Sequence, residues 1–194
     1  MIFIRELEQR ILEEGQILPG EVLKVGSFLN QQIDTKLLKA MGEEIARLFE
    51  GNNVTKVLTI ESSGIALAYS AAVALGVPMV FAKKHKSSNL AGNILTSKVF
   101  SYTHQQTYDI MVSGDYINSD DTILIVDDFL AMGNALNGLI DIIGQGGAKL
   151  AGCAIAIEKG FQGGGDALRA KGIRVESLAI IDRMTDDSLE FRPQ

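Results

Sequence analysis

The segment from Ile123 to Ala135 restricts the possible folds of this chain more than any other. It begins as an uninterrupted apolar run, continues through two adjacent aspartates, Asp127 and Asp128, and passes Gly133 into a stretch with helical periodicity. Continuous runs of branched apolar residues are typical of strands buried on both faces of a parallel sheet. The segment therefore predicts a buried strand that ends near Val126, a polar turn and a helix, which are the units of an α/β fold.

The helix expected after Gly133 has one apolar face and a start suited to an anion. Its apolar positions follow the i, i+3, i+4, i+7 spacing of a single buried stripe, namely Leu136, Leu139, Ile140 and Ile143. Free backbone N–H groups at a helix start attract a phosphate, and the helix dipole contributes about 0.3–1 kcal/mol. Gly133 allows a close approach of the backbone because it has no Cβ atom. We expect this turn to bind an anion beyond the carboxyl end of the strand.

Asp127 and Asp128 would repel each other, and each would raise the pKa of the other unless a partner compensates the charge. Ribose hydroxyl groups and a nearby Mg²⁺ ion are suitable partners. An ordinary polar turn after a strand is the alternative, since Asp and Gly are common in turns. The complete pattern of strand, paired carboxylates, glycine and helix favours a site for a phosphorylated sugar.

Periodicity along the rest of the chain predicts alternating helices and strands. Helices are expected from Ile4 to Gly15, after the N-cap Asp34 and over 65–75, and strands over 54–60, 78–82, 122–126, 149–157 and 174–181. Two further runs, 94–103 and 107–113, are expected to form an antiparallel pair across or beside the main sheet. Strands separated by helices pair in parallel through right-handed crossovers. The prediction is one α/β domain with a central, mostly parallel sheet.

Composition excludes several classes of function. A chain of 194 residues with 46% hydrophobic residues can bury one sizeable core, and a net charge of −6 without a long basic stretch argues against nucleic acid as a partner. No apolar run approaches the ~20 residues needed to span a membrane, and a signal-peptide pattern is lacking. The single cysteine, Cys153, lies in an apolar run and is expected to be a buried thiol in a reducing compartment. A cytoplasmic location is expected.

Two polar segments follow the first two core strands. Glu61-Ser62-Ser63-Gly64 precedes a helix, so its hydroxyl and N–H groups are suited to a second anion, with plain N-capping as the alternative. Lys83-Lys84-His85-Lys86 is suited to close over a polyanion, although such a run is usually just a solvated loop.

The segment 123–135 resembles the signature with which type I phosphoribosyltransferases bind phosphoribosyl pyrophosphate (PRPP). The resemblance implies the fold of that family, with a small N-terminal hood over residues 1–36, a core over 37–194 and a mobile loop. It implies that Asp127 and Asp128 are catalytic and hold the ribose hydroxyls. The implied PRPP-binding residues are Ala131, Met132, Gly133, Asn134 and Ala135, and the implied pyrophosphate-binding residues are Ser62, Ser63 and Lys84.

Segments outside this signature resemble the xanthine branch of the family over nearly the whole chain. Residues 23–34, which read by themselves as a loop with core anchors, resemble its hood segment and imply that Leu23 and Asn30 contact the purine. Glu158-Lys159-Gly160-Phe161 implies the same for Lys159, which could donate to a 6-oxo oxygen and disfavour a 6-amino group. A solvated lysine at a strand end is the alternative.

The chain departs from the family signature at several positions. Met132 and Ala135 stand where many members have Thr, and Asn134 stands where many have Gly, so hydroxyl donors to the 5′-phosphate are missing. Ala131 occupies the place of an acid that the hypoxanthine–guanine branch uses at the purine N7. Alanine cannot perform that function. This difference fits a more acidic base such as xanthine, which ionises without strong help.

The resemblance implies transfer of the 5-phosphoribosyl group from PRPP to N9 of xanthine in purine salvage, giving xanthosine 5′-monophosphate and pyrophosphate. Mg²⁺ would be carried by PRPP, and the family habit implies a homodimer with small-molecule substrates and no nucleic-acid or membrane partner. Another purine, such as adenine, guanine or hypoxanthine, is an alternative substrate. A PRPP-sensing regulator is a further alternative, although no separate helix-turn-helix segment is present in the sequence.

Overall fold

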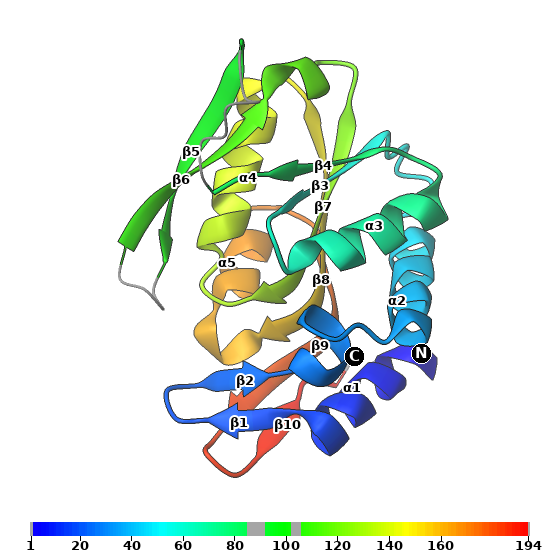
Figure 1. The fold of residues 1–194 in the computed structure, drawn as a ribbon, viewed down its shortest axis with the longest axis vertical. Coiled ribbons are helices and arrows are strands. Elements are labelled where there is room, and N and C mark those ends of the chain that lie inside the picture. Colours follow the sequence, from blue (N-terminus) through cyan, green and yellow to red (C-terminus); the bar gives the residue numbers. More distant parts are fainter. Residues whose placement is uncertain (1, 85–91, 102–105, 194) are drawn as a thin grey trace.

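The computed structural model describes residues 2–84, 92–101 and 106–193 (Figure 1). The helices are α1 Ile2–Glu14, α2 Thr35–Leu48, α3 Gly64–Leu75, α4 Asn134–Gln145 and α5 Gly164–Ala170, with short helical turns η1 Gly26–Asn30, η2 Gly114–Tyr116 and η3 Gly160–Gln162. The strands are β1 Gln16–Leu18, β2 Val22–Lys24, β3 Lys56–Ile60, β4 Met79–Ala82, β5 Ile94–Ser101, β6 Gln106–Ser113, β7 Thr122–Leu130, β8 Lys149–Lys159, β9 Val175–Met184 and β10 Leu189–Phe191. His85 and Lys86 of the expected basic segment lie outside the described residues.

The main sheet has six strands in the order β10-β9-β8-β7-β3-β4. All neighbours are parallel except β10, which is antiparallel to β9. The expectation of a mostly parallel sheet is therefore confirmed. The chain passes from β3 to β4 on one side and later to β7 on the other, so the direction of winding reverses between β3 and β7. In open α/β sheets, ligands bind in the crevice at the carboxyl ends of the strands at such a reversal.

Helices cover both faces of this sheet (Figure 1). Alternate residues of β7 point to opposite faces, as a strand requires. Leu124 and Val126 belong to the core that includes α1, α2 and α3, whereas Ile123 and Ile125 belong to the core built with α4. Because β7 is buried on both faces, it reads in the sequence as one continuous apolar run.

Two hairpins lie outside the main sheet. β1 pairs with β2, and β5 pairs with β6, each antiparallel. The predicted antiparallel pair beside the main sheet is thus confirmed, and it packs on α4, where a Cβ atom added at Gly138 would come within 2.7 Å of Val99. None of the described helices has the length and apolar character needed to cross a membrane.

The prediction that this strand, β7, ends near Val126 was wrong. The strand continues to Leu130, because Asp127 and Phe129 pair with Ile155 and Ile157 of β8. The long apolar run of β8 offers backbone partners well past the aspartates. Asp127 and Asp128 therefore lie within a strand, and the turn begins only after Leu130.

The segment 23–34 is not a loop, and this expectation was also wrong. Its first residues belong to β2, and Gly26–Asn30 forms a five-residue helical turn that buries Phe28 and Leu29. Asp34 does cap α2 as predicted, since its carboxylate accepts the backbone N–H groups of Lys36 and Leu37. The hood is therefore an ordered hairpin and turn.

Smaller differences concern the C-terminal half. Ile142 is buried in α4, whereas the predicted Ile140 is only partly buried against the same core. Neither α5 nor β10 was predicted from the sequence. The glycines at 163–165 are poor helix formers, so the start of α5 carries no helical signal. β10 has three residues, which is too short to show the alternation of a strand.

Candidate active site

The two aspartates of β7 occupy the point where the winding of the sheet reverses. Both are buried, with 5% of each residue exposed. Asp128 accepts hydrogen bonds from Ser63 Oγ at 3.0 Å and from Asn30 Nδ2 at 3.2 Å. One carboxylate thus connects β7 to the start of α3 and to the end of η1.

Asp127 has fewer partners than Asp128. Its Oδ1 accepts the backbone N–H of Asp128 at 3.0 Å. Burial raises the pKa of Asp127 well above its usual range, the negative charge of Asp128 raises it further, and the positive charge of Lys84 opposes the shift. A carboxyl group in these surroundings gains from ligands that donate hydrogen bonds or bring positive charge, which is how sugar hydroxyls and an electron-poor ring carbon behave.

The loop between β3 and α3 presents two exposed serines beside these carboxylates. Ser63 is the N-cap residue of α3, yet its side chain makes no capping hydrogen bond and donates to Asp128 instead. The peptide between Glu61 and Ser62 is cis. A Cβ atom added at Gly64 would lie 2.4 Å from both Asp127 Oδ1 and Thr59 Oγ1, so only glycine fits there. The serine loop and the carboxylates therefore form one surface.

Lys84 lies on the same side of the sheet, close to the end of β4. Its backbone N–H donates to Glu61 Oε1 at 2.7 Å, and its Nζ lies 5.6 Å from the centroid of the Tyr108 ring. Burial and the charge of Asp127 raise the pKa of Tyr108. Lys84 thus faces the carboxylates of its own chain, and the structure adds Tyr108 to the site. A tyrosine in an alternating strand carries no signal that would have identified it in the sequence.

The turn from Ala131 to Ala135 connects β7 to α4. Gly133 is the N-cap residue of α4 with a φ of +84°, a conformation that favours glycine. Its carbonyl accepts both the backbone N–H and the side-chain amide of Asn137, at 2.9 and 2.8 Å. Asn134 Nδ2 donates to the carbonyl of Phe100 on β5 at 3.0 Å. The turn is therefore held from two sides, and backbone N–H groups at such a helix start are suited to an anion.

That space is a cavity of about 520 Å³. It is lined by the turn and the first residues of α4, by parts of the two hairpins, and by the end of β8, including Tyr108, Phe129, Lys159, Gln162 and residues 20–22. Lys159 Nζ donates to the carbonyl of Glu21 at 2.6 Å and lies 6.0 Å from the centroid of the Phe129 ring. Burial lowers the pKa of Lys159. The hood hairpin and this lysine thus close one end of the cavity.

Leu23 and Asn30 line a second cavity of about 440 Å³ between α1 and the hood. Leu23 is buried in β2, while its neighbour Val22 faces the larger cavity. Successive residues of a strand point to opposite faces, so Leu23 and Val22 cannot both line the larger cavity. Asn30 reaches Asp128, as described above. The structure therefore brings Asn30 to the carboxylates and places Leu23 behind the hood.

Within the described ranges, no group of three or more His, Cys, Asp or Glu side chains could hold a metal ion. The combined features are two buried carboxylates with a serine loop and Lys84 near them, and a cavity lined by the turn 131–135 and Lys159. This arrangement is suited to a ligand with hydroxyl groups between two phosphate-bearing ends.

Comparison with known proteins points to the same chemistry. Residues 27–180 match the family model described as the phosphoribosyl transferase domain. The chain is 53% identical over 185 residues to a xanthine phosphoribosyltransferase of Ruminiclostridium cellulolyticum, covering 95% of this chain and 97% of the relative. It is 50% identical over 188 residues to the enzyme of that name from Oceanobacillus iheyensis, covering 97% of each.

Solved structures share the fold. The adenine phosphoribosyltransferase of Giardia lamblia, complexed with 9-deazaadenine, superposes with a TM-score of 0.77 at 22% identity, covering 93% of this chain and 98% of that one. The adenine phosphoribosyltransferase of Rhodothermus marinus gives a TM-score of 0.74 at 24% identity, covering 92% and 98%. Similarity at this level of identity is informative about the fold alone.

Proposed function

The chain belongs to the phosphoribosyl transferase family, and from that premise we propose that it transfers the 5-phosphoribosyl group of PRPP to N9 of xanthine. The products are xanthosine 5′-monophosphate and pyrophosphate, as purine salvage requires. Relatives named for this activity are about half identical to the chain over nearly its full length. The observation that carries the proposal is the cavity lined by the turn 131–135, Lys159 and Phe129, the residue that directly follows the paired aspartates.

In the proposed reaction, the bond between ribose C1 and the pyrophosphate oxygen breaks, and the bond between C1 and purine N9 forms with inversion. Pyrophosphate leaves with the electron pair of the broken bond, and the purine loses the N9 proton to solvent. Positive charge develops on the ribose ring in the transition state. Asp127 and Asp128 hold the ribose hydroxyls and stabilise that charge, with no covalent nucleophile.

The two turns bind the two anionic ends of PRPP in this proposal. Backbone N–H groups of residues 131–135 bind the 5′-phosphate, with Gly133 allowing the close approach. Ser62, Ser63 and Lys84 stabilise the departing pyrophosphate, and Mg²⁺ enters as part of the substrate, bound to its phosphate oxygens. Ser63 Oγ lies beside Asp128 and makes no helix cap, which supports a place for it next to the ribose. Its single O–H donates to Asp128 in the free protein and would have to turn to the pyrophosphate on binding.

Base recognition is assigned to Lys159, Asn30 and Leu23. Lys159 is held at the end of the cavity by Glu21 and can turn its remaining N–H donors toward a 6-oxo oxygen. Asn30 contacts the carboxylate that would hold the ribose, so a base attached at C1 comes within its reach. Leu23 faces the cavity behind the hood, so in this proposal it acts on base recognition by supporting the hood hairpin that carries Val22.

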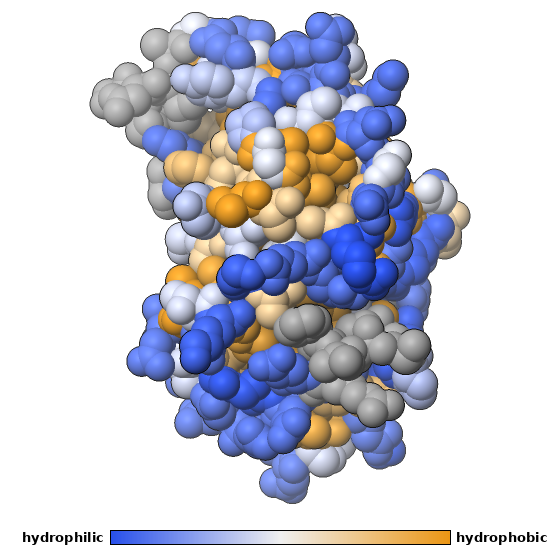
Figure 2. All heavy atoms as spheres, turned by 90° about the vertical axis from the view of Figure 1, so that its right-hand side faces the viewer, coloured by the Kyte–Doolittle hydropathy of each residue, from blue (hydrophilic) through white to orange (hydrophobic). Residues whose placement is uncertain are grey.

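We further propose that two copies associate through the exposed face of α3, as cytoplasmic homodimers. This helix is apolar all round, and such helices are normally buried on every side. Leu67, Ala68 and Ala71 pack into the core, but Tyr69 and Val73, one turn apart, are each 62% exposed. Figure 2 looks onto the side of the molecule where α2 and α3 lie, and it shows apolar side chains gathered above a hydrophilic band. A second copy is the occupant that this proposal assigns to the face.

The experiment that tests the activity is pyrophosphate release from Mg²⁺-PRPP, with xanthine, guanine, hypoxanthine, adenine and uracil supplied separately. We expect turnover dominated by xanthine. Turnover dominated by another base would keep the PRPP site and reject Leu23, Asn30 and Lys159 as xanthine selectors. Binding of PRPP without turnover of any base would favour a PRPP-sensing regulator.

A further inference from the structure

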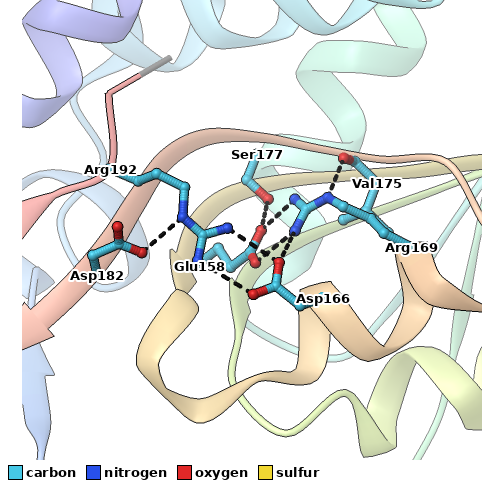
Figure 3. A network of polar contacts seen from close by, with 7 residues as sticks. All are labelled: Glu158, Asp166, Arg169, Val175, Ser177, Asp182 and Arg192. Carbon is cyan, nitrogen blue, oxygen red and sulfur yellow. Dashed lines mark hydrogen bonds and ion pairs between the residues drawn. The ribbon is translucent and has the colours of Figure 1, made fainter.

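Glu158 is the most deeply buried charged residue of the C-terminal half, with 0% exposed. Arg169 of α5 forms a bidentate ion pair with this carboxylate, in which Nη1 donates to Oε1 at 2.9 Å and Nη2 donates to Oε2 at 2.7 Å. Ser177 of β9 donates to Oε2 at 2.5 Å. Figure 3 shows the carboxylate enclosed between these two partners. Such a pair is weak evidence for stability, because apolar replacements of similar volume are often neutral.

The position of Glu158 in the sheet links it to both ends of the proposed substrate site. It pairs with Leu130, the last residue before the phosphate-binding turn. It also directly precedes Lys159, whose side chain lines the cavity. Since neighbouring strand residues point to opposite faces, fixing the Glu158 side chain on the α5 face directs Lys159 to the cavity face.

The first residues of α5 fill the space between Glu158 and the phosphate-binding turn. A Cβ atom added at Gly165 would lie 2.0 Å from Glu158 Oε1, so the carboxylate rests directly on the helix backbone. A Cβ atom added at Gly164 would lie 2.2 Å from the carbonyl oxygen of Ala131, and the Gly164 N–H donates to that oxygen at 3.2 Å. A continuous chain of contacts therefore runs from the carboxylate through α5 to the turn.

A second arginine, Arg192, connects the first turn of α5 to β9. Arg192, near the C-terminus, contacts Asp166 at 3.1 Å and Asp182 at 2.7 Å, and Asp166 also contacts Arg169 at 3.2 Å (Figure 3). Both arginines thus share Asp166 in the first turn of α5. The helix has only seven residues, and Leu168 is the one large apolar side chain that it buries. A helix this short is not stable by itself, so its position depends on these contacts.

We propose that Glu158 is a positioning residue of the transfer reaction. Through Arg169 and α5 it holds the backbone of residues 131–133 in the conformation that receives the 5′-phosphate, and it orients Lys159 toward the base. The assignment of the turn and of Lys159 to substrate rests on the proposed function. The mechanical part, that the ion pair holds the turn, stands on the contacts alone.

The test replaces the polar cluster with apolar groups, by the triple variant Glu158→Met, Arg169→Met and Ser177→Ala. The matched control is Glu44→Met with Arg47→Met on α2, where another buried glutamate is gripped by an arginine at 2.6 and 2.8 Å, away from the cavity. Thermal unfolding, PRPP-dependent turnover and residue-resolved hydrogen exchange are measured on all three proteins. The exchange is followed at the amides of Gly164 and Asn137, whose N–H groups donate to the carbonyls of Ala131 and Gly133 in the turn.

We expect the triple variant to keep a melting temperature close to that of the wild type. Exchange of the Gly164 and Asn137 amides, which are hydrogen-bonded to the turn, should be at least about tenfold faster, and kcat/KM for PRPP should fall by about tenfold or more. The control should change neither. A folded triple variant with wild-type exchange in the turn would overturn the proposal. Exchange decides this even if the wild type converts no base, a result that would count against the proposed function alone.

A milder variant covers the case in which the triple variant does not fold. Arg169→Lys keeps the positive charge but removes the two-pronged geometry. Faster exchange in the turn, smaller than in the triple variant, is expected from it. Exchange equal to that of the wild type in a folded Arg169→Lys protein would also reject the positioning role.

Discussion

At the scale of single residues, Asp127 and Asp128 carry the same charge but have different surroundings. Asp128 accepts hydrogen bonds from two side chains, whereas Asp127 accepts one backbone N–H and is buried against Gly64. Both residues are buried, but burial raises the pKa of Asp127, whereas Asp128 connects β7 to η1 and α3 through hydrogen bonds. The two residues should therefore respond differently to substitution.

Asp128→Ala is expected to lower PRPP-dependent turnover by at least about 10²-fold, because it removes a carboxylate proposed to stabilise charge in the transition state. Ser63 and Asn30 lose a shared partner but retain access to solvent, so the protein should still fold. Steady-state kinetics and circular dichroism check the two statements. Asp120→Ala, in an exposed turn, is the control, and near wild-type turnover in Asp128→Ala would remove the central assignment.

Asp127→Asn is expected to stabilise the free protein at neutral pH by about 1 kcal/mol or more while lowering turnover. The pKa of Asp127 is raised in the folded state, so below the unfolded value of 3.8 the native and variant proteins should be similar. As the pH rises through the folded pKa, the native carboxyl must ionise in a buried site beside Asp128 and stability falls. The variant lacks this loss. Urea unfolding from pH 4 to pH 8 should show its advantage growing with pH, and a constant difference would contradict the assignment.

Lys159→Gln is expected to lower kcat/KM for xanthine by about 10–100-fold, which corresponds to loss of a hydrogen bond from a charged donor. The KM for PRPP should change much less, since the lysine lies at the hood end of the cavity. Lys149→Gln, at the opposite end of the same strand, is the matched control. Equal losses for xanthine and PRPP would mean that Lys159 does not select the base.

At the scale of elements, the site depends on where each helix begins. α3 begins at Gly64 against the aspartates, α4 begins after Gly133 in the turn 131–135, and α5 begins at Gly164 against that same turn. Gly64 and Gly164 allow a closer approach to a neighbouring group than any side chain would, whereas Gly133 allows the positive φ of the turn. The glycines therefore determine the geometry of the site although none of them carries chemistry.

Gly64→Ala is expected to destabilise the protein by about 1–3 kcal/mol, since the new methyl group would displace Asp127 and Thr59. Turnover should fall as well, because the displaced group is the proposed catalytic carboxylate. Gly144→Ala in α4 meets no atom within 4 Å and should be neutral or stabilising by up to about 1 kcal/mol. Differential scanning calorimetry of both variants, with kinetics, makes the comparison. Wild-type stability in Gly64→Ala would show that the loop can move freely.

At the scale of the whole molecule, the outer face of α3 is unusually apolar for a surface exposed to solvent. α3 is apolar on every side, and its outer face is exposed. The Cys153 thiol, in contrast, is fully enclosed, and burial raises its pKa to about 12. The described interior is thus closed within one copy, while α3 leaves Tyr69 and Val73 exposed at the surface.

Tyr69→Lys combined with Val73→Lys is expected to convert a dimer into a monomer, because the two charges would be buried against a second copy. Light scattering coupled to gel filtration gives the mass directly. Lys substitutions at Leu12 and Val22, which are exposed elsewhere, should leave the mass unchanged. A wild-type protein that is monomeric at all concentrations would reject the assignment of this face.

The sequence by itself determined the α/β class, the order of the core strands and the segment that carries the paired aspartates and the turn before α4. Those features depend on local periodicity and on residues adjacent in the chain, as in Ile123–Ala135 and at the Asp34 cap. Only the tertiary structure decided the end of β7, the order within hood residues 23–34, and the presence of Tyr108 at the cavity. It also revealed the chain of contacts from Glu158 to the turn. These features arise from pairing and packing between distant segments, and such contacts leave no periodic signal in either partner.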